Sequence, residues 1–191
     1  MKRIYLGIVG PIAAGKGVVT EYLSHKYGFI SFSLSSIVHE ELRRRGIKKF
    51  DRATLQNIGN ELRAKYGNQV LAERALNILN HNGIKKMIIE GIRNPGEVKL
   101  LKKLSNFYLI AVTAKKHVRY KRLVSRKKPW DPKNWEEFLV ISNRDLGLKE
   151  DKRGQQVGEC IEMADHTITN NGDLKSFYKK IEKIARQLRI K

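Results

Sequence analysis

The sequence predicts an α/β fold of three layers, with a five-stranded parallel sheet flanked by helices. Two observations favour this fold class. Short apolar segments that are typical of buried strands alternate along the chain with segments whose apolar residues recur at helical spacing. The first apolar segment also runs directly into a glycine-rich loop, GPIAAGKG at residues 10–17, which an amphipathic segment follows. No linker-like stretch interrupts the alternation, so residues 1–191 are expected to form a single domain.

Five segments are predicted strands, because each is a short apolar run bounded by glycine, proline or polar residues. In chain order they are residues 3–9, 29–32, 86–90, 107–112 and 166–169. Strands that alternate with helices in this way pair in parallel, so their carboxyl ends meet at one edge of the sheet. Ligands of such folds bind at that edge, and candidate functional residues are therefore sought just after each strand.

The predicted helices lie between these strands. Gly28 ends the first helix, Ser33 or Ser35 can cap the second, and Pro95 starts the fifth. The third and fourth helices, separated at Gly67, carry apolar residues at helical spacing, which predicts core positions rather than cofactor contacts. The helices are expected at residues 18–27, 36–45, 54–66, 69–80, 95–104, 116–126, 135–145 and 174–189.

Composition restricts the classes of protein to consider. Apolar residues make up 41% of the chain, which suits a globular core, and no apolar run is long enough to span a membrane. We therefore expect a soluble, cytoplasmic protein with no membrane partner. Cys160 is the single cysteine and is predicted to be a small core residue rather than a nucleophile. No cysteine and histidine cluster has metal-ligand spacing, which argues against a zinc deaminase.

The formal net charge of +20 implies attraction to polyanions or to phosphorylated ligands. Lys and Arg are spread through the whole chain, so most of them are expected on solvated helix faces. Any nucleic-acid binding that follows from this charge is expected to be non-specific.

The loop at residues 10–17 has the pattern of a Walker A phosphate-binding loop. In such a loop the backbone N–H groups surround a phosphate, the lysine reaches its oxygens, and the following helix points its positive end at them. The alternative is a glycine-rich turn with a solvated lysine, but the preceding strand and following helix favour phosphate binding. The predicted nucleotide-binding residues are Gly10, Ala13, Ala14, Gly15, Lys16, Gly17 and Val18.

Gly17 stands where most such loops carry a Ser or Thr that ligates Mg²⁺. It offers no oxygen, so the metal must be held by phosphates, waters and another acid. Glu90, at the end of the third strand, is the predicted metal ligand, and Arg93 is placed to bind a second phosphate. The alternative for Glu90 is a structural carboxylate that caps the turn at Asn94.

Arginines follow the fourth strand. Arg119, Arg122 and Arg126 recur at helical spacing, and Arg144 comes after a segment at residues 127–134 that contains two prolines and Trp130. That segment is predicted to be a mobile flap. Arginines that arrive from a lid suit phosphoryl transfer, because the transferred group spreads negative charge over its oxygens. Such a row can equally be a solvated basic face, which we favour for Arg119 alone.

With these motifs in this order, the whole chain resembles the P-loop nucleoside monophosphate kinases. The Gly-Lys-Gly ending of the loop is similar to that of adenylate kinases. The phrases at residues 55–67, 92–98 and 154–157 resemble the kinase-like domain fused to deoxycytidylate-type deaminases. They also resemble small archaeal P-loop proteins of unassigned activity that are related to nucleotide and dephospho-coenzyme A kinases.

The resemblance implies a P-loop kinase fold, with acceptor-binding helices at about 34–82 and a lid at about 127–145. It implies that Lys16 contacts the donor phosphates, Glu90 holds Mg²⁺ and Arg93 binds the acceptor phosphate. It also places three arginines around the transferred group: Arg122, Arg126 and Arg144. Three residues depart from the family pattern and bear on acceptor identity: Ser36 replaces a common aspartate, His39 an acceptor-binding arginine, and Val18 a threonine.

We therefore expect an enzyme that uses ATP and Mg²⁺ to phosphorylate a nucleotide-like monophosphate. Three alternatives remain at this point. The chain could be a nucleotide-binding regulatory module that acts through a partner, or a dephospho-coenzyme A kinase-like enzyme. The net charge of +20 leaves open a nucleic-acid-associated ATPase.

Overall fold

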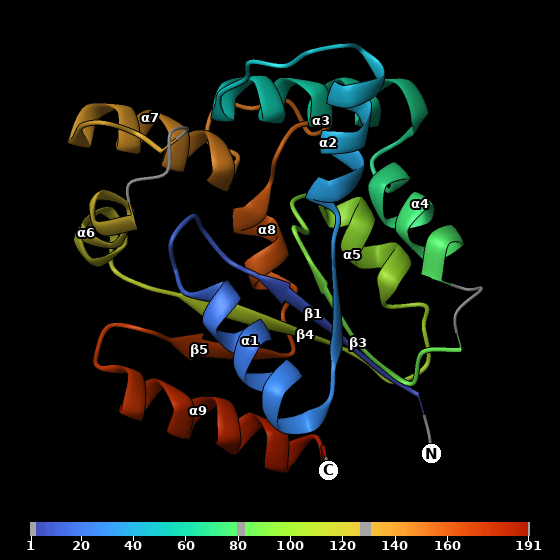
Figure 1. Cartoon of the computed structure of the whole chain (residues 1–191), viewed down its shortest axis with the longest axis vertical. Coiled ribbons are helices and arrows are strands. Elements are labelled where there is room, and N and C mark those ends of the chain that lie inside the picture. Colours follow the sequence, from blue (N-terminus) through green and yellow to red (C-terminus); the bar gives the residue numbers. More distant parts are fainter. Residues whose placement is uncertain (1–2, 80–82, 127–130, 191) are drawn as a thin grey trace.

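The computed structural model describes residues 3–79, 83–126 and 131–190 (Figure 1). Strands and helices alternate along this part of the chain, as the sequence predicts. The strands are β1 (Ile4–Val9), β2 (Ile30–Ser33), β3 (Lys86–Glu90), β4 (Phe107–Thr113) and β5 (His166–Thr169). The helices are α1 (Lys16–Tyr27), α2 (Ser35–Arg44), α3 (Arg52–Tyr66), α4 (Val70–Leu79), α5 (Pro95–Leu101), α6 (Lys116–Arg126), α7 (Trp135–Leu146), α8 (Val157–Glu162) and α9 (Leu174–Gln187).

All five strands form one parallel sheet in the order β2-β3-β1-β4-β5, which confirms the predicted fold class. In register, Ile8 of β1 lies beside Glu90 of β3 and Ile110 of β4. The loop after β1 therefore emerges at the centre of the carboxyl edge, next to the end of β3. Helices α6 and α7 lie beyond this edge of the sheet (Figure 1).

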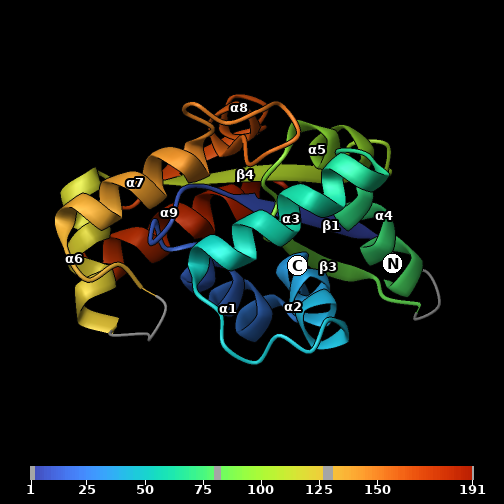
Figure 2. The same cartoon turned by 90° about the horizontal axis from the view of Figure 1, so that it is seen from above.

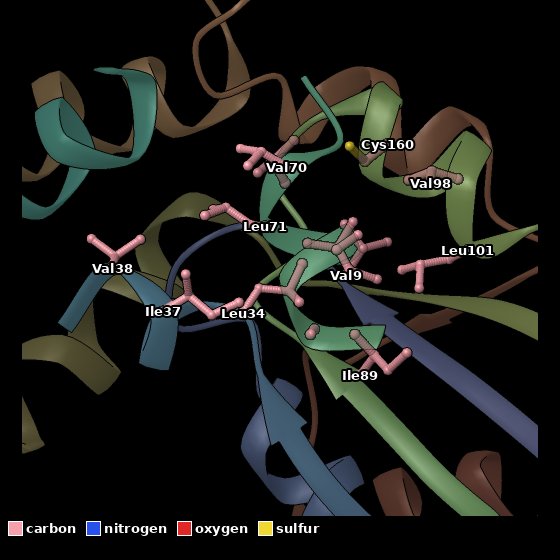
Figure 3. Close-up of a cluster of buried hydrophobic side chains, with 14 of the residues drawn as sticks. Val9, Leu34, Ile37, Val38, Val70, Leu71, Ile89, Val98, Leu101 and Cys160 are labelled. Atoms are coloured by element: carbon pink, nitrogen blue, oxygen red, sulfur yellow. The ribbon is translucent and has the colours of Figure 1, made fainter. Parts of the chain in front are cut away.

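The sheet separates two hydrophobic clusters. One contains Leu6 and Ile8 of β1 and the inner faces of α1 and α9. The other contains Val9 together with buried residues of α2, α3, α4, α5 and α8, and Figure 3 shows part of it around Val9 and Ile89. Figure 2 shows α5 and α8 on the opposite side of the strands from α1. Side chains that alternate along β1 thus serve both layers, which is why the strand is apolar throughout.

Cys160 lies in the second cluster and is fully buried, as its predicted core role requires (Figure 3). Burial raises the pKa of its thiol well above the ordinary value. A thiol that stays protonated is a poor nucleophile, so the side chain acts in packing.

Helix α5 begins with a complete capping box. The Asn94 side chain accepts a hydrogen bond from the backbone of the first turn, the Glu97 carboxylate accepts one from the Asn94 N–H, and Pro95 occupies the first helical position. The predicted start of this helix at Pro95 is thereby confirmed. The cap also fixes the segment between β3 and α5, which carries Arg93.

The structure differs from the sequence prediction at several places. Neither Ser33 nor Ser35 caps α2, whose N-cap is Leu34 with no side-chain hydrogen bond. Helix α5 ends at Leu101 rather than at residue 104.

Helix α8 was not predicted, because its six residues include Gly158 and are too few to be stable alone. Tertiary packing forms it, since Val157 and Cys160 are buried. Part of the predicted flap, residues 127–130 with Trp130, lies outside the described residues.

No helix in the described part of the chain is both long enough and apolar enough to cross a membrane.

Candidate functional site

The loop after β1 adopts a conformation that only glycine allows at two positions. Gly10 has φ 146°, and a Cβ there would lie 2.0 Å from the Val112 carbonyl oxygen. Gly15 has φ 108°, and a Cβ there would lie 2.3 Å from the Asn170 side chain. Helix α1 starts at the next residue with no side-chain cap, so its first N–H groups are directed at the space that the loop surrounds. Loop and helix end together make a phosphate-binding arrangement.

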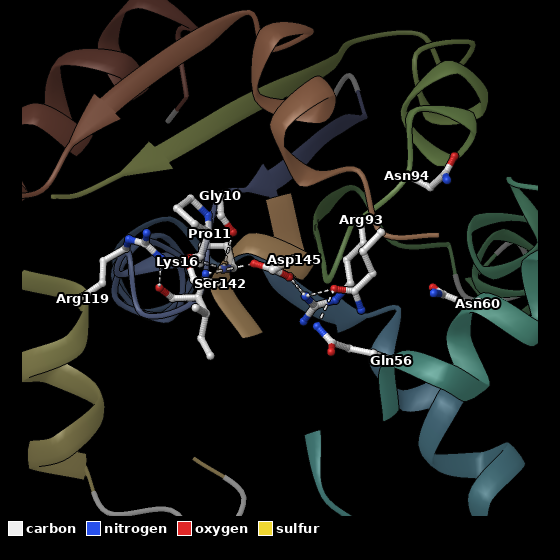
Figure 4. Close-up of polar contacts among 12 residues, drawn as sticks. Gly10, Pro11, Lys16, Gln56, Asn60, Arg93, Asn94, Arg119, Ser142 and Asp145 are labelled. Carbon is white, nitrogen blue, oxygen red and sulfur yellow. Dashed lines mark hydrogen bonds and ion pairs between the residues drawn. The ribbon is translucent and has the colours of Figure 1, made fainter. Parts of the chain in front are cut away.

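Lys16 spans this loop. Its Nζ donates hydrogen bonds to the carbonyl oxygens of Gly10 at 2.6 Å and Pro11 at 3.0 Å (Figure 4). Burial lowers the pKa of Lys16 from 10.5 to about 8, and the nearby carboxylates of Asp145 and Glu90 act in the opposite direction. The ammonium is thus held at the loop within electrostatic range of two acids.

Asp145 of α7 connects the loop to the segment after β3. Its Oδ2 accepts a hydrogen bond from the Ile12 N–H at 3.1 Å, and its Oδ1 binds the Arg93 guanidinium in an ion pair (Figure 4). The side chain is 3% exposed. A buried carboxylate thereby places the predicted acceptor arginine beside the phosphate-binding loop. Asp145 is not among the site residues predicted from the sequence.

Arg144, the predicted lid arginine, points elsewhere. It binds Glu150 at 3.0 Å and Asn57 of α3 at 2.8 Å. Adjacent residues on a helix point about 100° apart, so only one member of the Arg144-Asp145 pair can face the loop. The two residues are adjacent in the sequence, but the rotation of α7 about its axis turns Asp145, and not Arg144, toward the loop.

Arg122 braces the loop from α6. Its guanidinium donates to the Ala14 carbonyl at 3.2 Å and to the backbone and side-chain oxygens of Asn170 at 3.0 and 3.1 Å. It therefore joins the phosphate-binding loop to the turn after β5. Its predicted place around the transferred group stays a prediction. Arg126 binds Asp131 at 2.5 and 2.6 Å and makes no described contact with the loop.

The prediction that the Arg119 side chain is solvated is wrong. It is 2% exposed, donates to the Ile12 carbonyl at 3.2 Å and to the Ser142 hydroxyl at 3.1 Å, and lies over the Phe138 ring. Three positions separate it from Arg122, so both residues share the helix face that meets the loop. Figure 4 shows Arg119 on the side of the loop away from Arg93. The helical spacing of the arginines does not show which face of α6 packs against the rest of the protein.

Glu90 lies at the carboxyl end of β3, beside the loop. Its carboxylate has no hydrogen-bond or ion-pair partner among the described residues, and its charge raises the pKa of nearby Lys16. An unengaged carboxylate at this position fits a Mg²⁺ ion that keeps most of its waters. The described residues contain no group of three or more metal-binding side chains, so other ligands would come from phosphate and water. The capping alternative for Glu90 is wrong, because Glu97 performs that role.

A narrow pocket lies between the loop, α2, α3, α7 and the segment after β3. Its cavity volume is about 50 Å³. Ser35 of α2 lines it. His39, which departs from the family pattern, packs against Phe50. The polar lining also includes residues that the sequence analysis missed, Arg52, Gln56 and Gln155.

Known proteins resemble this chain over most of its length. A family described as "AAA domain" matches residues 6–144. A UPF0200 protein of Thermococcus sibiricus is 32% identical over 192 residues, which cover 96% of this chain and 95% of that protein.

Two solved structures share the fold. The structure of TT1252 from Thermus thermophilus has a TM-score of 0.63 at 16% identity and covers 98% of this chain and 99% of its own. Shikimate kinase from Bacteroides thetaiotaomicron has a TM-score of 0.58 at 12% identity, with 97% and 98% covered. These likenesses show that the chain has a P-loop kinase-like fold.

Proposed function

We propose, since the chain belongs to the UPF0200 family and to the AAA domain family, that it is a kinase that uses ATP and Mg²⁺ to phosphorylate a nucleotide-like monophosphate. One observation carries the proposal. The phosphate-binding loop with Lys16 and the guanidinium of Arg93 converge on Asp145, so groups suited to two different phosphates lie side by side.

The donor phosphates would occupy the loop. Its backbone N–H groups and the start of α1 supply hydrogen bonds, and Lys16 supplies positive charge. Glu90 is the residue that would hold Mg²⁺ through water, since Gly17 has no oxygen to offer. The ion would neutralise negative charge on the donor phosphates.

The acceptor phosphate would bind Arg93 and displace the Asp145 carboxylate from it. A phosphate and a carboxylate compete for the same guanidinium, so acceptor binding would loosen the link between α7 and the segment after β3. Arg122 already lies against the loop and would neutralise charge on the transferred group. Arg126 and Arg144 would reach it only after α6 and α7 move, because both are engaged with acidic partners.

A coupled ADP-release assay tests this function across ribonucleoside and deoxyribonucleoside monophosphates, with dephospho-coenzyme A as a further acceptor. We expect one acceptor to stimulate ADP release and Lys16→Ala to reduce the rate by at least about 100-fold. Lys99→Ala, which removes an exposed lysine of α5, is the matched control and should keep the wild-type rate. Wild-type activity in a folded Lys16→Ala protein would rule out the proposed role of the loop.

A second candidate is a regulatory module that binds a nucleotide and acts through a partner. The ion pair of Arg93 with Asp145 favours it, because that contact ties up the cation that an acceptor phosphate needs. This function predicts tight nucleotide binding in calorimetry and no ADP release with any acceptor. The same panel of monophosphates therefore separates the two candidates.

A further inference from the structure

Two buried polar atoms without a partner belong to residues that line the same pocket. Within the described residues, four buried side-chain atoms lack a hydrogen-bond partner, and two of them are Nε of Arg52 and Oε1 of Gln56. Both residues line the pocket beside Arg93. They lie one turn apart on α3 and so share a face. Because a buried polar group without a partner is destabilising, a ligand that pairs with both atoms is favoured.

The orientation of the Gln56 amide follows from its neighbours. Arg93 has only donors, so the Gln155 atom that faces it at 3.4 Å must be the oxygen. The same oxygen lies 3.2 Å from the Gln56 amide, which must therefore donate its Nε2–H. The remaining atom, Oε1, is an acceptor, and Gln56 is only 4% exposed. Figure 4 shows Gln56 directed toward Arg93.

Around Arg52, at the N-terminal end of α3, positive charge exceeds negative charge. Among the described residues, Arg52 has one acidic partner, Asp131, which it shares with Arg126, and its contact with that carboxylate is 3.2 Å long. Burial and the charge of Arg93 both lower the pKa of Arg52. A phosphate that binds Arg52 and Arg93 together would relieve this repulsion.

We propose that this pocket binds the acceptor as a nucleoside monophosphate, with its phosphate on Arg52 and Arg93 and an N–H donor of its base on Gln56 Oε1. The inference rests on the proposed function and deepens it, because it makes Gln56 a specificity-determining residue. Four residues on a helix rise about 6 Å, a spacing that one sugar ring can bridge.

The rest of the lining favours a base over a sugar phosphate. A polyol needs several polar partners, whereas among the described lining residues Gln56 Oε1 is the side-chain acceptor left without a hydrogen bond. The other walls are apolar and suit the flat faces of a base, and they come from Val38, Leu55, Leu71 and Ile141. Ligand pockets usually exceed about 300 Å³, so the present cavity of about 50 Å³ must widen as the acceptor enters.

Calorimetric binding without ATP tests the proposal. The monophosphate that binds most tightly is compared with an analogue that lacks the base donor: purine riboside 5′-monophosphate for AMP, 2-pyrimidinone riboside 5′-monophosphate for CMP, or N3-methyluridine 5′-monophosphate for UMP. We expect wild type to prefer the natural nucleotide by at least about tenfold. Gln56→Met should abolish the preference, Gln56→Glu should retain it because an acceptor remains, and Gln187→Leu on α9 should leave it unchanged.

Arg52→Met should weaken both members of the pair by a similar factor, because they carry the same phosphate. A preference that persists in folded Gln56→Met would overturn the proposal, as would ribose 5-phosphate binding as tightly as the nucleotide.

ADP release, measured on the same proteins, distinguishes the base contact from the kinase function. Transfer to a monophosphate with no effect of Gln56→Met rejects the base contact and leaves the kinase function standing. Failure of wild type to bind ATP rejects the kinase function, while the ATP-free titrations still report on the pocket.

Discussion

The buried surroundings of Lys16 disfavour the charged form of its side chain. Burial lowers its pKa from 10.5 to about 8, although carbonyl oxygens of Gly10 and Pro11 receive its hydrogen bonds. Removing an ammonium from water has a free-energy cost that these contacts offset only in part. The residue is therefore placed for a phosphate at the expense of stability, as is common at functional sites.

The pKa of Lys16 predicts how stability depends on pH. Since the folded-state pKa is lower than the unfolded-state value, the unfolded chain binds more protons at pH values between about 8 and 10.5. The free energy of unfolding of wild type should rise relative to Lys16→Met across that range. At neutral pH the variant should be the more stable protein and should fail to bind ATP. Urea unfolding of both proteins measures the difference, and a difference that does not change with pH would contradict the prediction.

A second prediction at the scale of single residues concerns the contribution of Asp145 to stability. Asp145→Ala leaves the Ile12 N–H without its acceptor and Arg93 without its carboxylate, so we expect a loss of about 3 kcal/mol in the free energy of unfolding. Asp151→Ala removes an aspartate whose ion pair with Arg153 is exposed, and it should cause no measurable change. Denaturant unfolding compares the two. Equal effects would show that Asp145 does not anchor the loop.

Helices α3 and α5 are joined by one carboxylate. Glu97 accepts hydrogen bonds from Arg63 through Oε1, at 3.0 and 2.8 Å, and from the Arg93 N–H through Oε2, at 2.7 Å. Arg63 and Glu97 are 1% and 0% exposed. The same side chain thus caps α5, orients the backbone that carries Arg93, and holds α3, which carries Arg52 and Gln56. The relative position of these helices determines the shape of the pocket.

A double-mutant cycle tests this coupling between elements. Arg63→Met should cost about 3 to 5 kcal/mol of stability, because it leaves Glu97 charged, buried and unpaired. Adding Glu97→Gln should recover much of that loss, since an amide keeps an acceptor for the cap without the charge. Glu61→Gln, in an exposed ion pair with Arg45, is the control and should have no measurable effect. Strict additivity of the two changes would show that Arg63 and Glu97 are not coupled.

At the scale of the whole molecule, the charge of +20 spreads over much of the surface. The outer face of α9 is an example. Its single acid, Glu182, is engaged by Lys26, Tyr22 and Tyr27. The exposed cations of this helix that have no described partner are Lys175, Lys179, Lys183 and Arg186.

We expect weak, sequence-independent binding to nucleic acid, with the logarithm of the association constant falling linearly with the logarithm of salt concentration. Replacing Lys179 and Lys183 together by Gln should reduce the slope by about 2, if both contact phosphates. The pair Lys48→Gln and Lys49→Gln makes the same change in net charge at another place and serves as the control. Fluorescence anisotropy at several salt concentrations measures the slope. Stimulation of ADP release by RNA or DNA would contradict incidental binding and support a nucleic-acid-associated ATPase.

The sequence by itself determined the strands, the phosphate-binding loop and the cap of α5. Each depends on residues that are contiguous in the chain, so backbone geometry and local hydrogen bonds specify them. Gly10 and Gly15 allow a loop that other residues would obstruct, and Glu90 follows from the end of an apolar strand.

Only the tertiary structure decided which side chains meet across the sheet edge. Ile12 and Asp145 are 133 positions apart, and Gln56 and Gln155 are 99 positions apart. Contacts over such separations depend on how helices rotate as they pack, and no local pattern encodes that rotation. For the same reason Arg119 is buried although its spacing suits a surface, Arg144 faces away from the loop, and α8 forms from six residues that would not be helical alone.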